Sequence, residues 1–419
     1  MSKRVVIIGA GVIGLSTAYY CARRGFDVTV VERHSAQRDG CSFGNAGLIV
    51  PSHFVPLAAP GMIALGLKWM WNPASPFYIR PRLNADLIGW GIKFWRAANA
   101  GHVQRSAPLL RDLSLASRAC FEEIAALPEV DFGLVKKGLL MLCQSGHALD
   151  EEAGTARWAR ELGIPAEVLD AKQTAALDPG ARMNIAGSVY FPLDCHLSPS
   201  RFMAALQSQL ERLGVKFQWD CEALHFEIEN GRHIRGVATA GGNRIEADEF
   251  VLCGGMWSPD LAGQLGLRIP MQAGKGYSLT LIRPRSLPHL CSILTEARVA
   301  VTPMGETLRV GGTMEIAGMN EDINPLRVRG IMDSFCRYYP EFQPADFEGV
   351  QPWRGLRPCS PDGLPYVGRT TKFTNLSLAT GHAMMGLSLG PVTGQLIADV
   401  LSGEKPRHDI TLLSPDRYY

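Results

Sequence analysis

The sequence predicts an α/β fold built on a parallel sheet, and three patterns support this class. The run at 5–8 is fully apolar, which is typical of a strand buried on both faces. An apolar-periodic helix from Leu15 to Arg24 and a second apolar run at 28–31 follow it, as in a strand–helix–strand unit. Strands of the same buried type precede Gly254 and Gly381, so we expect distant segments to complete one sheet.

The turn between the first strand and the helix carries glycines at 9, 11 and 14. Gly9 suits a tight turn, Gly11 lets a pyrophosphate approach the backbone, and Gly14 lets the helix pack closely on the strand. The helix N-terminus offers free N–H groups and a partial positive charge to the phosphates. Glu32 ends the second strand, where its carboxylate can accept hydrogen bonds from a ribose diol. The pattern therefore predicts a dinucleotide site in a Rossmann-type domain; a glycine turn without a ligand is the alternative.

Composition excludes several classes of protein. The 419 residues allow two domains, and 46% hydrophobic with 20% charged residues is an ordinary globular balance. The net charge of +2, with no basic cluster among aromatics, argues against nucleic acid. The ten cysteines form no CxxC pair, so we expect no metal site, no disulfide framework and a reduced compartment. We expect neither a bilayer span, which needs about 20 continuous apolar residues, nor a secretion signal, because glycines interrupt the first apolar run.

The segment 54–71 is apolar, rich in Trp and Met, and carries Lys68 as its one charge. One interpretation is a surface element that dips into a membrane interface, with the tryptophans at headgroup level. The other is a buried helix that covers the active site. The sequence leaves both open.

The order of predicted elements indicates two discontinuous domains. The dinucleotide domain comprises 1–54, 196–270 and 346–419, and a second domain on a mixed or antiparallel sheet comprises 55–195 and 271–345. Further helices are expected at 106–127, 148–162, 198–213, 325–338 and 387–401. Further strands are expected at 138–143, 215–219, 223–229, 234–240, 248–253, 276–283, 291–302, 307–314 and 376–379.

Three later motifs contain residues suited to a flavin and its substrate. The loop 42–47 (SFGNAG) has small residues that allow backbone contact with a pyrophosphate or a flavin ring, although Gly-Asn is also ordinary turn chemistry. The segment 353–369 sets arginines among prolines, as in a fixed anion clamp or a turn with surface arginines. The glycine-rich helix entry at 380–386 can stabilise negative charge on a reduced flavin, or it is a plain strand-to-helix turn.

Taken together, the N-terminal unit, SFGNAG, VLCGGMWS, GKGYSLT, RVGGTMEIAG, GLRPCSPDGLPYVGR and TGHAMMG resemble the D-amino-acid dehydrogenase branch of the FAD-dependent D-amino-acid oxidase superfamily. The resemblance runs from Lys3 to about Leu401. It implies non-covalent FAD, hydride transfer from the substrate Cα to flavin N5, and hydrolysis of the resulting imino acid. Cofactor contacts are expected at Gly9, Gly11, Val12, Ile13, Gly14, Glu32, Arg33, Ser42, Asn45, Ala46, Gly47, Gly254, Trp257, Gly381, His382, Met384, Met385 and Gly386.

The resemblance also implies a substrate anchor. Arg357 occupies the position that pairs with the substrate carboxylate in this superfamily, and Tyr277, His382 and His53 are weaker candidates for the substrate pocket. Each of these three has a structural alternative. Tyr277 would be a packed strand tyrosine, His382 a hydrogen-bonded histidine, and His53 a packing or surface histidine. No general base is nominated, because a neutral substrate amine needs none.

Two departures from the pattern bear on the substrate. Relatives often carry an arginine near Pro303, and this chain has none there, so a second carboxylate anchor is missing or comes from elsewhere. Methionines 384 and 385 replace commoner residues, which favours a compact or cyclic substrate such as D-proline or cis-4-hydroxy-D-proline. Cys359 does not match the pattern of relatives that attach flavin covalently.

A quinone-type acceptor is expected, with location in the cytoplasm or on the inner face of the bacterial inner membrane. The alternatives are an oxygen-using oxidase of glycine, sarcosine or a D-amino acid, and a flavin subunit that needs partner chains. An NAD(P)-dependent dehydrogenase or a non-catalytic nucleotide-binding module is a further alternative.

Overall fold

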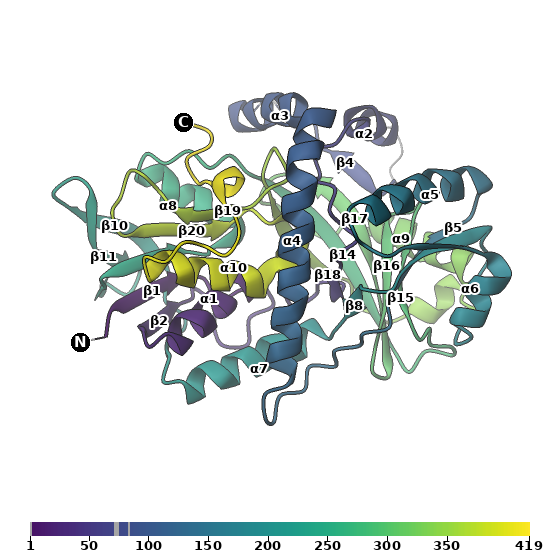
Figure 1. Cartoon of the computed structure of the whole chain (residues 1–419), viewed down its shortest axis with the longest axis horizontal. Helices are drawn as coiled ribbons and strands as arrows, with labels where there is room; N and C mark the ends of the chain where they lie inside the picture. Colours follow the sequence, from purple (N-terminus) through teal and green to yellow (C-terminus); the bar gives the residue numbers. More distant parts are fainter. Residues whose placement is uncertain (1, 71–74, 83) are drawn as a thin grey trace.

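The computed structural model describes residues 2–70, 75–82 and 84–419, and its strands form two large sheets side by side (Figure 1). Helix α4 (Ala100–Ala125) runs between the two halves. Helices α2 (Met62–Met70) and α3 (Ala85–Ala97) lie across one end of the molecule. The predicted mixed α/β class is confirmed.

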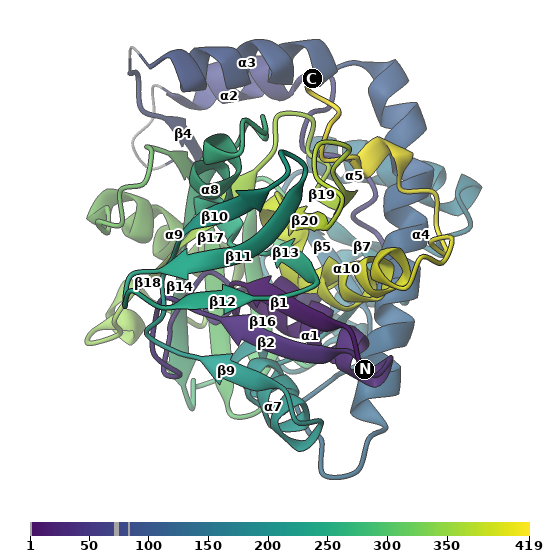
Figure 2. The ribbon, with the colours of Figure 1, turned by 90° about the vertical axis from the view of Figure 1, so that its left-hand side faces the viewer.

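The first sheet has the strand order β19-β20-β13-β1-β2-β9, and all neighbours are parallel except β19 and β20. Strands β13 and β20 are the two that precede Gly254 and Gly381, so distant segments do complete the N-terminal unit (Figure 2). The strands are β1 (Arg4–Ile8), β2 (Asp27–Val31), β9 (Lys216–Gln218), β13 (Glu249–Leu252), β19 (Tyr366–Arg369) and β20 (Leu376–Thr380).

Helices α1 (Val12–Arg23), α7 (Pro199–Arg212), α8 (Ser258–Gln264) and α10 (Gly386–Leu401) pack around this sheet. Contact between α1 and α10 is very close, because a Cβ on Gly394 would lie 2.4 Å from the backbone of Ser16. The small sheet of β10 (Ala223–Glu229), β11 (His233–Thr239) and β12 (Arg244–Glu246) and the pair of β3 (Leu48–Ile49) with β8 (Cys195–His196) complete this half.

By length and composition, one helical stretch among the described residues, 383–401, is apolar enough to cross a membrane. The sequence predicted a helix at 387–401 but no bilayer span, because no stretch has about 20 continuous apolar residues. In the structure this stretch is largely buried, since α10 packs against both α1 and α4. It is the core helix of this half of the molecule.

The second sheet has the order β18-β14-β17-β16-β15-β5-β7-β6, with β4 beside β17. Helix α9 (Pro325–Tyr338) packs on its β17 and β16 strands, and α5 (Gly146–Glu161) and α6 (Ala171–Leu177) pack beside β5, β6 and β7. Its strands are β4 (Phe77–Ile79), β5 (Leu139–Cys143), β6 (Glu167–Asp170), β7 (Gly187–Phe191), β14 (Gln272–Ile282), β15 (Cys291–Leu294), β16 (Val299–Met304), β17 (Thr307–Ile316) and β18 (Trp353–Cys359).

The structure corrects two details of the second domain. The single strand expected at 291–302 is two, β15 and β16, because the chain turns at 295–298 and pairs with itself. The segment 353–359, assigned from the sequence to the dinucleotide domain, is β18 and hydrogen-bonds along β14 in the second sheet. Arginines, a glycine and a proline leave β18 without apolar alternation, so the sequence did not indicate a strand there.

Candidate active site

A cleft of about 530 Å³ lies where the first sheet meets the second. It begins beside Glu32 at the end of β2 and continues past Gly11 to Arg357 on β18 and His382 after β20. The carboxyl ends of β1, β13 and β20 open into it, which is where open parallel sheets bind ligands.

The three N-terminal glycines differ in what surrounds them. Gly9 has φ +106°, and a Cβ there would lie 2.6 Å from the carbonyl oxygen of Cys253. A Cβ on Gly14 would lie 1.8 Å from the Gly9 carbonyl oxygen, so both glycines are required by packing. A Cβ on Gly11 would meet only Ser42 Oγ, at 3.6 Å, and would otherwise enter the cleft. The space beside Gly11 is therefore available to a ligand and not needed by the protein.

The outer end of the cleft has the polar groups that a ribose and an adenine ring need. The Glu32 carboxylate accepts hydrogen bonds from the N–H groups of Ala10 (2.8 Å) and His34 (3.1 Å). The Arg33 guanidinium stacks 3.7 Å from the centre of the Trp257 ring. Arg38, which the sequence did not indicate, lies buried across the turn and donates to the Ala10 carbonyl at 2.9 Å.

The SFGNAG loop is held to the second sheet by groups from three strands. Ser278 Oγ on β14 donates to the Gly44 carbonyl at 3.0 Å. Arg309 on β17 donates from one terminal nitrogen to the carbonyls of Phe43 (3.0 Å) and Asn45 (2.9 Å). Trp353 on β18 covers Gly44, where a Cβ would lie 2.0 Å from the indole ring. The second sheet therefore fixes the loop that faces the cofactor.

Replacing Arg309 with methionine should weaken FAD binding roughly ten-fold or more, because two buried carbonyls lose their donor, at about 1–3 kcal/mol each. Burial already lowers the pKa of Arg309 to about 10, yet the guanidinium stays charged at neutral pH. Fluorescence titration of the apoprotein with FAD measures the effect. Arg283→Met, at an exposed arginine just after β14, is the control, and an unchanged dissociation constant in the Arg309 variant would contradict this role.

The inner end of the cleft contains Arg357 and His382. The Arg357 guanidinium lies over Gly276, whose missing side chain makes room for it, and donates to the Thr313 carbonyl at 2.6 Å. Within the described part of the chain no carboxylate pairs with Arg357, so its charge is available to an anion. By contrast, Arg354 on the same strand pairs with Asp39 and Glu321.

His382 is buried and bonds through Nε2 to Thr393 Oγ1 at 2.9 Å. Burial lowers the pKa of His382 to about 3, so the ring is neutral at physiological pH. Its Nδ1 has no hydrogen-bond partner within the described residues, although it is buried. Because His382 lines the cleft, this nitrogen is available to a polar edge of a bound ring. Together with the open cradle at Gly11, it shows that the cleft fits FAD.

Most predicted cofactor residues line the cleft. They are Gly9, Gly11, Val12, Ile13, Glu32, Arg33, Ser42, Asn45, Gly254, Trp257, His382 and Gly386. The lining does not include Gly14, Ala46, Gly47, Gly381, Met384 or Met385. Met384 is 47% exposed and Met385 packs on the main core, so neither of the two methionines that favoured a compact or cyclic substrate lines the described cleft. Ala383 occupies the wall there instead.

Tyr277 does not line the cleft. Its ring is buried in the core under α9, and its hydroxyl donates to Glu315 Oε2 at 2.7 Å. The hydroxyl also accepts from the backbone N–H of Asn324 at 3.3 Å. Buried Lys275 bonds to the Asn320 side chain (2.8 Å) and the Asp322 carbonyl (2.6 Å) nearby. These contacts attach the start of α9 to the sheet, which is a structural role.

His53 also lies outside the cleft lining. Burial and nearby Arg298 lower its pKa to about 4, and its Nδ1 lies 3.0 Å from Ser52 Oγ. Ser52 donates through both its backbone N–H and its hydroxyl to Asp194, next to β8. This buried cluster joins the segment after the cofactor loop to the second domain.

Burial raises the pKa of Asp194 to about 7, against the opposing effect of its bonds from Ser52. In the unfolded chain the group titrates near pH 4, so between about pH 4 and 7 the folded protein holds a proton that the unfolded chain releases. The free energy of unfolding therefore falls as pH rises through this window. Asp194→Asn has no carboxyl group at this position, so this decrease in the free energy of unfolding should vanish. The free energy of unfolding of the variant minus that of wild type should therefore increase from about pH 4 to 7 and then level off. Urea unfolding at several pH values tests this; a pH-independent difference would contradict it.

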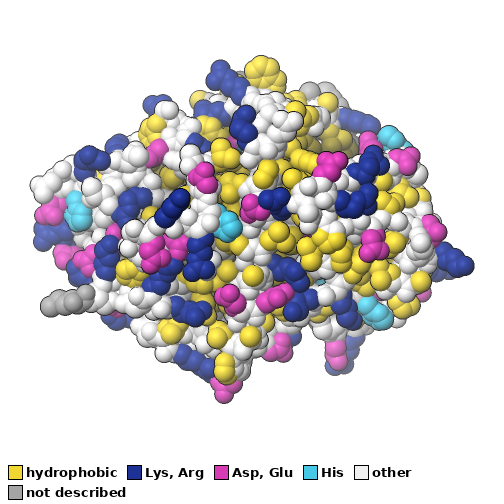
Figure 3. Space-filling view, viewed as in Figure 1, with side chains coloured by type: hydrophobic (Ala, Val, Ile, Leu, Met, Phe, Trp, Pro, Cys, Tyr) yellow, Lys and Arg dark blue, Asp and Glu magenta, His cyan; other side chains and the backbone are white. Residues whose placement is uncertain are grey.

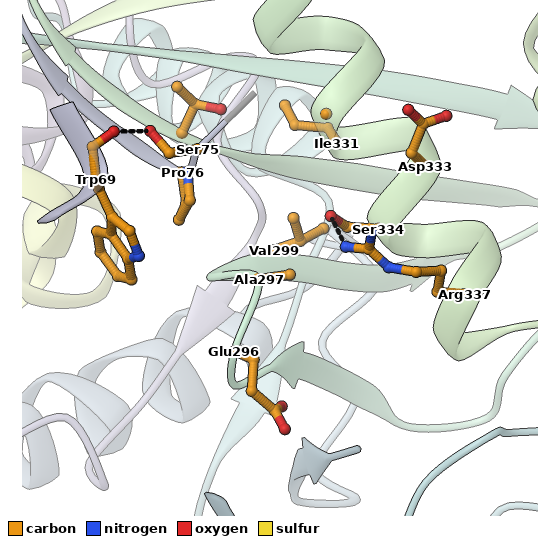
Figure 4. A pocket seen from close by; sticks show the side chains of 12 residues that line it. Trp69, Ser75, Pro76, Glu296, Ala297, Val299, Ile331, Asp333, Ser334 and Arg337 are labelled. Carbon is orange, nitrogen blue, oxygen red and sulfur yellow. Dashed lines mark hydrogen bonds between the residues drawn. The ribbon is translucent and has the colours of Figure 1, made fainter. Parts of the chain in front are cut away.

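Another cavity, of about 270 Å³, lies beneath α9 at the turn between β15 and β16 (Figure 4). Arg337 and Ser334 hydrogen-bond to each other on its α9 side, and Trp69 lies at its far side. It shares no described lining residue with the cleft. No group of three or more His, Cys, Asp or Glu among the described residues is placed to hold a metal ion.

Comparison with known proteins agrees with the geometry. Residues 4–400 match the family described as DAO, FAD dependent oxidoreductase. The chain is 32% identical over 424 residues to a D-amino acid dehydrogenase of Bradyrhizobium diazoefficiens, covering 99% of each chain. It is 34% identical to one of Cereibacter sphaeroides, covering 99% of this chain and 95% of that one. The crystal structure of glycine oxidase from Geobacillus kaustophilus superposes with a TM-score of 0.78 at 23% identity, covering 100% of both chains.

Proposed function

The chain belongs to the DAO family of FAD-dependent oxidoreductases, and on this basis we propose that it oxidises a D-amino acid held through its carboxylate by Arg357. The observation that carries the proposal is a guanidinium at the inner end of the cofactor cleft without a carboxylate partner among the described residues. A guanidinium binds a carboxylate through two parallel hydrogen bonds, which fixes the orientation of the substrate as well as its position.

Bound FAD supplies the two-electron redox chemistry, and the protein supplies position and charge. Arg357 fixes the carboxylate, so that the Cα–H of one enantiomer is directed at the ring. The His382 ring is neutral, and its Nε2 is already hydrogen-bonded. The ring therefore offers a hydrogen bond through Nδ1 and supplies no positive charge. The imine that leaves hydrolyses in water to a 2-oxo acid and ammonia, or stays cyclic when the substrate amine is part of a ring.

We propose a compact, apolar substrate, with D-proline and cis-4-hydroxy-D-proline as the specific candidates. Two observations support this. Arg309 is committed to the loop carbonyls, so it does not act as a second carboxylate anchor. Beside Arg357 the described lining includes the apolar residues Leu356, Pro358 and Ala383, and Ala383 packs on a buried apolar cluster, which disfavours a charged side chain. A kcat/KM series over D-proline, cis-4-hydroxy-D-proline, D-alanine and D-glutamate tests the proposal, and a preference for D-glutamate would contradict it.

We further propose that the electrons pass to a quinone and not to oxygen. The names of the relatives, dehydrogenases at 32–34% identity over nearly the full chain, support a dehydrogenase. The structurally similar oxidase is only 23% identical, which supports the fold alone. Turnover in air without peroxide, together with reduction of an added quinone, is the expected result. One peroxide formed for each substrate oxidised would favour the oxidase alternative.

A quinone acceptor would place the protein against the inner face of the bacterial inner membrane. The apolar surface that supports this lies on α3, and the sequence had indicated 54–71. Ile88, Ile92 and Trp95 form a stripe on one face of α3 and are 52%, 47% and 66% exposed. In the described part of 54–71, α2 packs on β4, and Trp69 faces inward.

A further inference from the structure

Helices α2 and α3 enclose an apolar chamber of about 210 Å³ against β4 and β17. Five of the residues that line it are aromatic: Trp69, Phe77, Trp90, Phe94 and Trp95. The others are aliphatic, methionine or glycine, and none of the described lining residues is charged. An amino acid would lose the hydration of both its charged groups there, so the chamber suits a flat, uncharged ligand.

One buried apolar cluster joins the chamber to the inner end of the cofactor cleft. Trp90 and Met314, which line the chamber, pack in one buried cluster with Cys359 and Ala383. Ala383 in turn lines the cleft, next to His382. Trp90 Nε1 also donates to the Cys359 carbonyl at 2.9 Å, two residues along β18 from Arg357. The chamber is therefore joined to the cleft by packed side chains, and a ligand in it would accept electrons without contact with the substrate.

The chamber meets the surface at the exposed stripe of α3. Trp95 lines the chamber and is 66% exposed, so it lies at the opening. Lys93 and Arg96 flank it in the sequence, and Figure 3 shows hydrophobic side chains beside Lys and Arg side chains over α3, at the top of the molecule. An opening at an exposed apolar stripe, on a helix that also carries basic residues, suits a ligand delivered from a membrane with anionic lipids.

We propose that this chamber binds the ring of the quinone that accepts the substrate's electrons. The inference rests on the proposed function and adds the place where the acceptor binds. The balance is two electrons and two protons: the substrate loses its Cα–H hydride and an amine proton to become an imine. The quinone gains the electron pair by way of the flavin together with two protons, so that its two carbonyls become the hydroxyls of a quinol.

Two glycines of α3 provide a matched pair of variants. Gly91 lines the chamber, and a Cβ built on it meets no atom within 4 Å, so Gly91→Leu fills the chamber without a clash at that atom. Gly89 is equally open, lies on the same helix and does not line the chamber. Because both substitutions replace a helical glycine with leucine, Gly89→Leu controls for effects on the helix and on surface hydrophobicity.

The holoenzyme, with both variants, is titrated with a ubiquinone bearing one isoprene unit while the fluorescence of the chamber tryptophans is followed. In parallel, two rates are measured under anaerobic conditions. One is the bleaching of the flavin by a D-amino acid without any quinone, and the other is the reduction of added quinone in the presence of the D-amino acid. The inference predicts that Gly91→Leu weakens quinone binding about ten-fold or more, leaves bleaching unchanged, and slows quinone reduction. Gly89→Leu should behave as wild type in all three measurements.

Three results would overturn the inference. The first is unchanged quinone binding in Gly91→Leu. The second is slower bleaching of the flavin in Gly91→Leu, which would assign the chamber to the substrate. The third is displacement of the quinone by a ring-less isoprenoid alcohol at a similar concentration, which would assign the chamber to lipid. If no D-amino acid bleaches the wild-type flavin, the proposed function fails, and the fluorescence titration still decides whether the chamber binds a quinone.

Discussion

Replacing Arg357 with alanine should lower kcat/KM for a D-amino acid by the equivalent of about 2–5 kcal/mol, with a strong rise in KM. The guanidinium is partly buried at the inner end of the cleft and lacks a carboxylate partner in the described part of the chain. Without it, the substrate carboxylate would enter a partly dehydrated site with no counter-charge. Steady-state kinetics with a quinone acceptor, over a wide range of substrate concentration, measures both constants.

Two comparisons keep this prediction specific. Arg357→Lys retains the charge but loses the two-pronged geometry, so its kcat/KM should lie between those of wild type and the alanine variant. An amine that lacks the carboxylate should be oxidised as poorly by the wild type as by the variant. A near-normal kcat/KM for the full amino acid in Arg357→Ala would remove this residue from the carboxylate role.

Replacing Gly11 with valine should abolish FAD binding while leaving the protein folded. The side chain would occupy the cleft where the pyrophosphate approaches the helix N-terminus, yet its Cβ would meet only Ser42 Oγ, at 3.6 Å. Absorbance of the purified protein near 450 nm, a band that belongs to the flavin itself, measures cofactor content. A yellow variant fully loaded with FAD would contradict the assignment of Gly11.

The control for Gly11→Val is the stability of the apoproteins. Thermal unfolding of the variant should match that of wild-type apoprotein, because the substitution fills a cleft and not a packed contact. Gly14→Val should behave differently, since a Cβ there would lie 1.8 Å from the Gly9 carbonyl oxygen. That variant should lose stability as well as FAD, which separates a packing glycine from a ligand-facing one.

Most residues that the sequence nominated for the cofactor line one cleft, and they could be nominated because their signals are local. The glycine turn, Glu32 and the strands before Gly254 and Gly381 each lie in one short segment with a strong apolar pattern. Buried parallel strands pair with one another, so these segments were expected to share one sheet. In the structure β13 lies beside β1, and β20 lies beside β13. Arg357 was found through the resemblance, since a strand with its composition carries no strand pattern of its own.

The contacts that sequence reasoning missed depend on pairing between distant segments. Arg309 reaches the SFGNAG loop only because β17 lies opposite that loop, more than 260 residues along the chain. Tyr277 was nominated for the substrate pocket, but its side chain is buried in the core under α9. It lies next to a bulge in the pairing of β14 with β17. In LRVGG, Arg309 precedes two glycines. This pattern could have indicated a long side chain that reaches from the strand to the loop.

The surface of α3 was also missed, for a different reason. Its apolar residues follow two helical faces: Trp90 and Phe94 face the chamber, and Ile88, Ile92 and Trp95 are exposed. A helix apolar on both faces gives no clear periodicity, so the helices expected from the sequence do not include α3.

Anaerobic mixing of the purified holoenzyme with matched D- and L-amino acids, followed at the flavin band, tests the central claim most directly. The account predicts bleaching by a D-amino acid, fastest for a compact apolar one such as D-proline, and none by its L-enantiomer. Bleaching by the L-enantiomer at the same rate, or by no amino acid despite bound FAD, would contradict it.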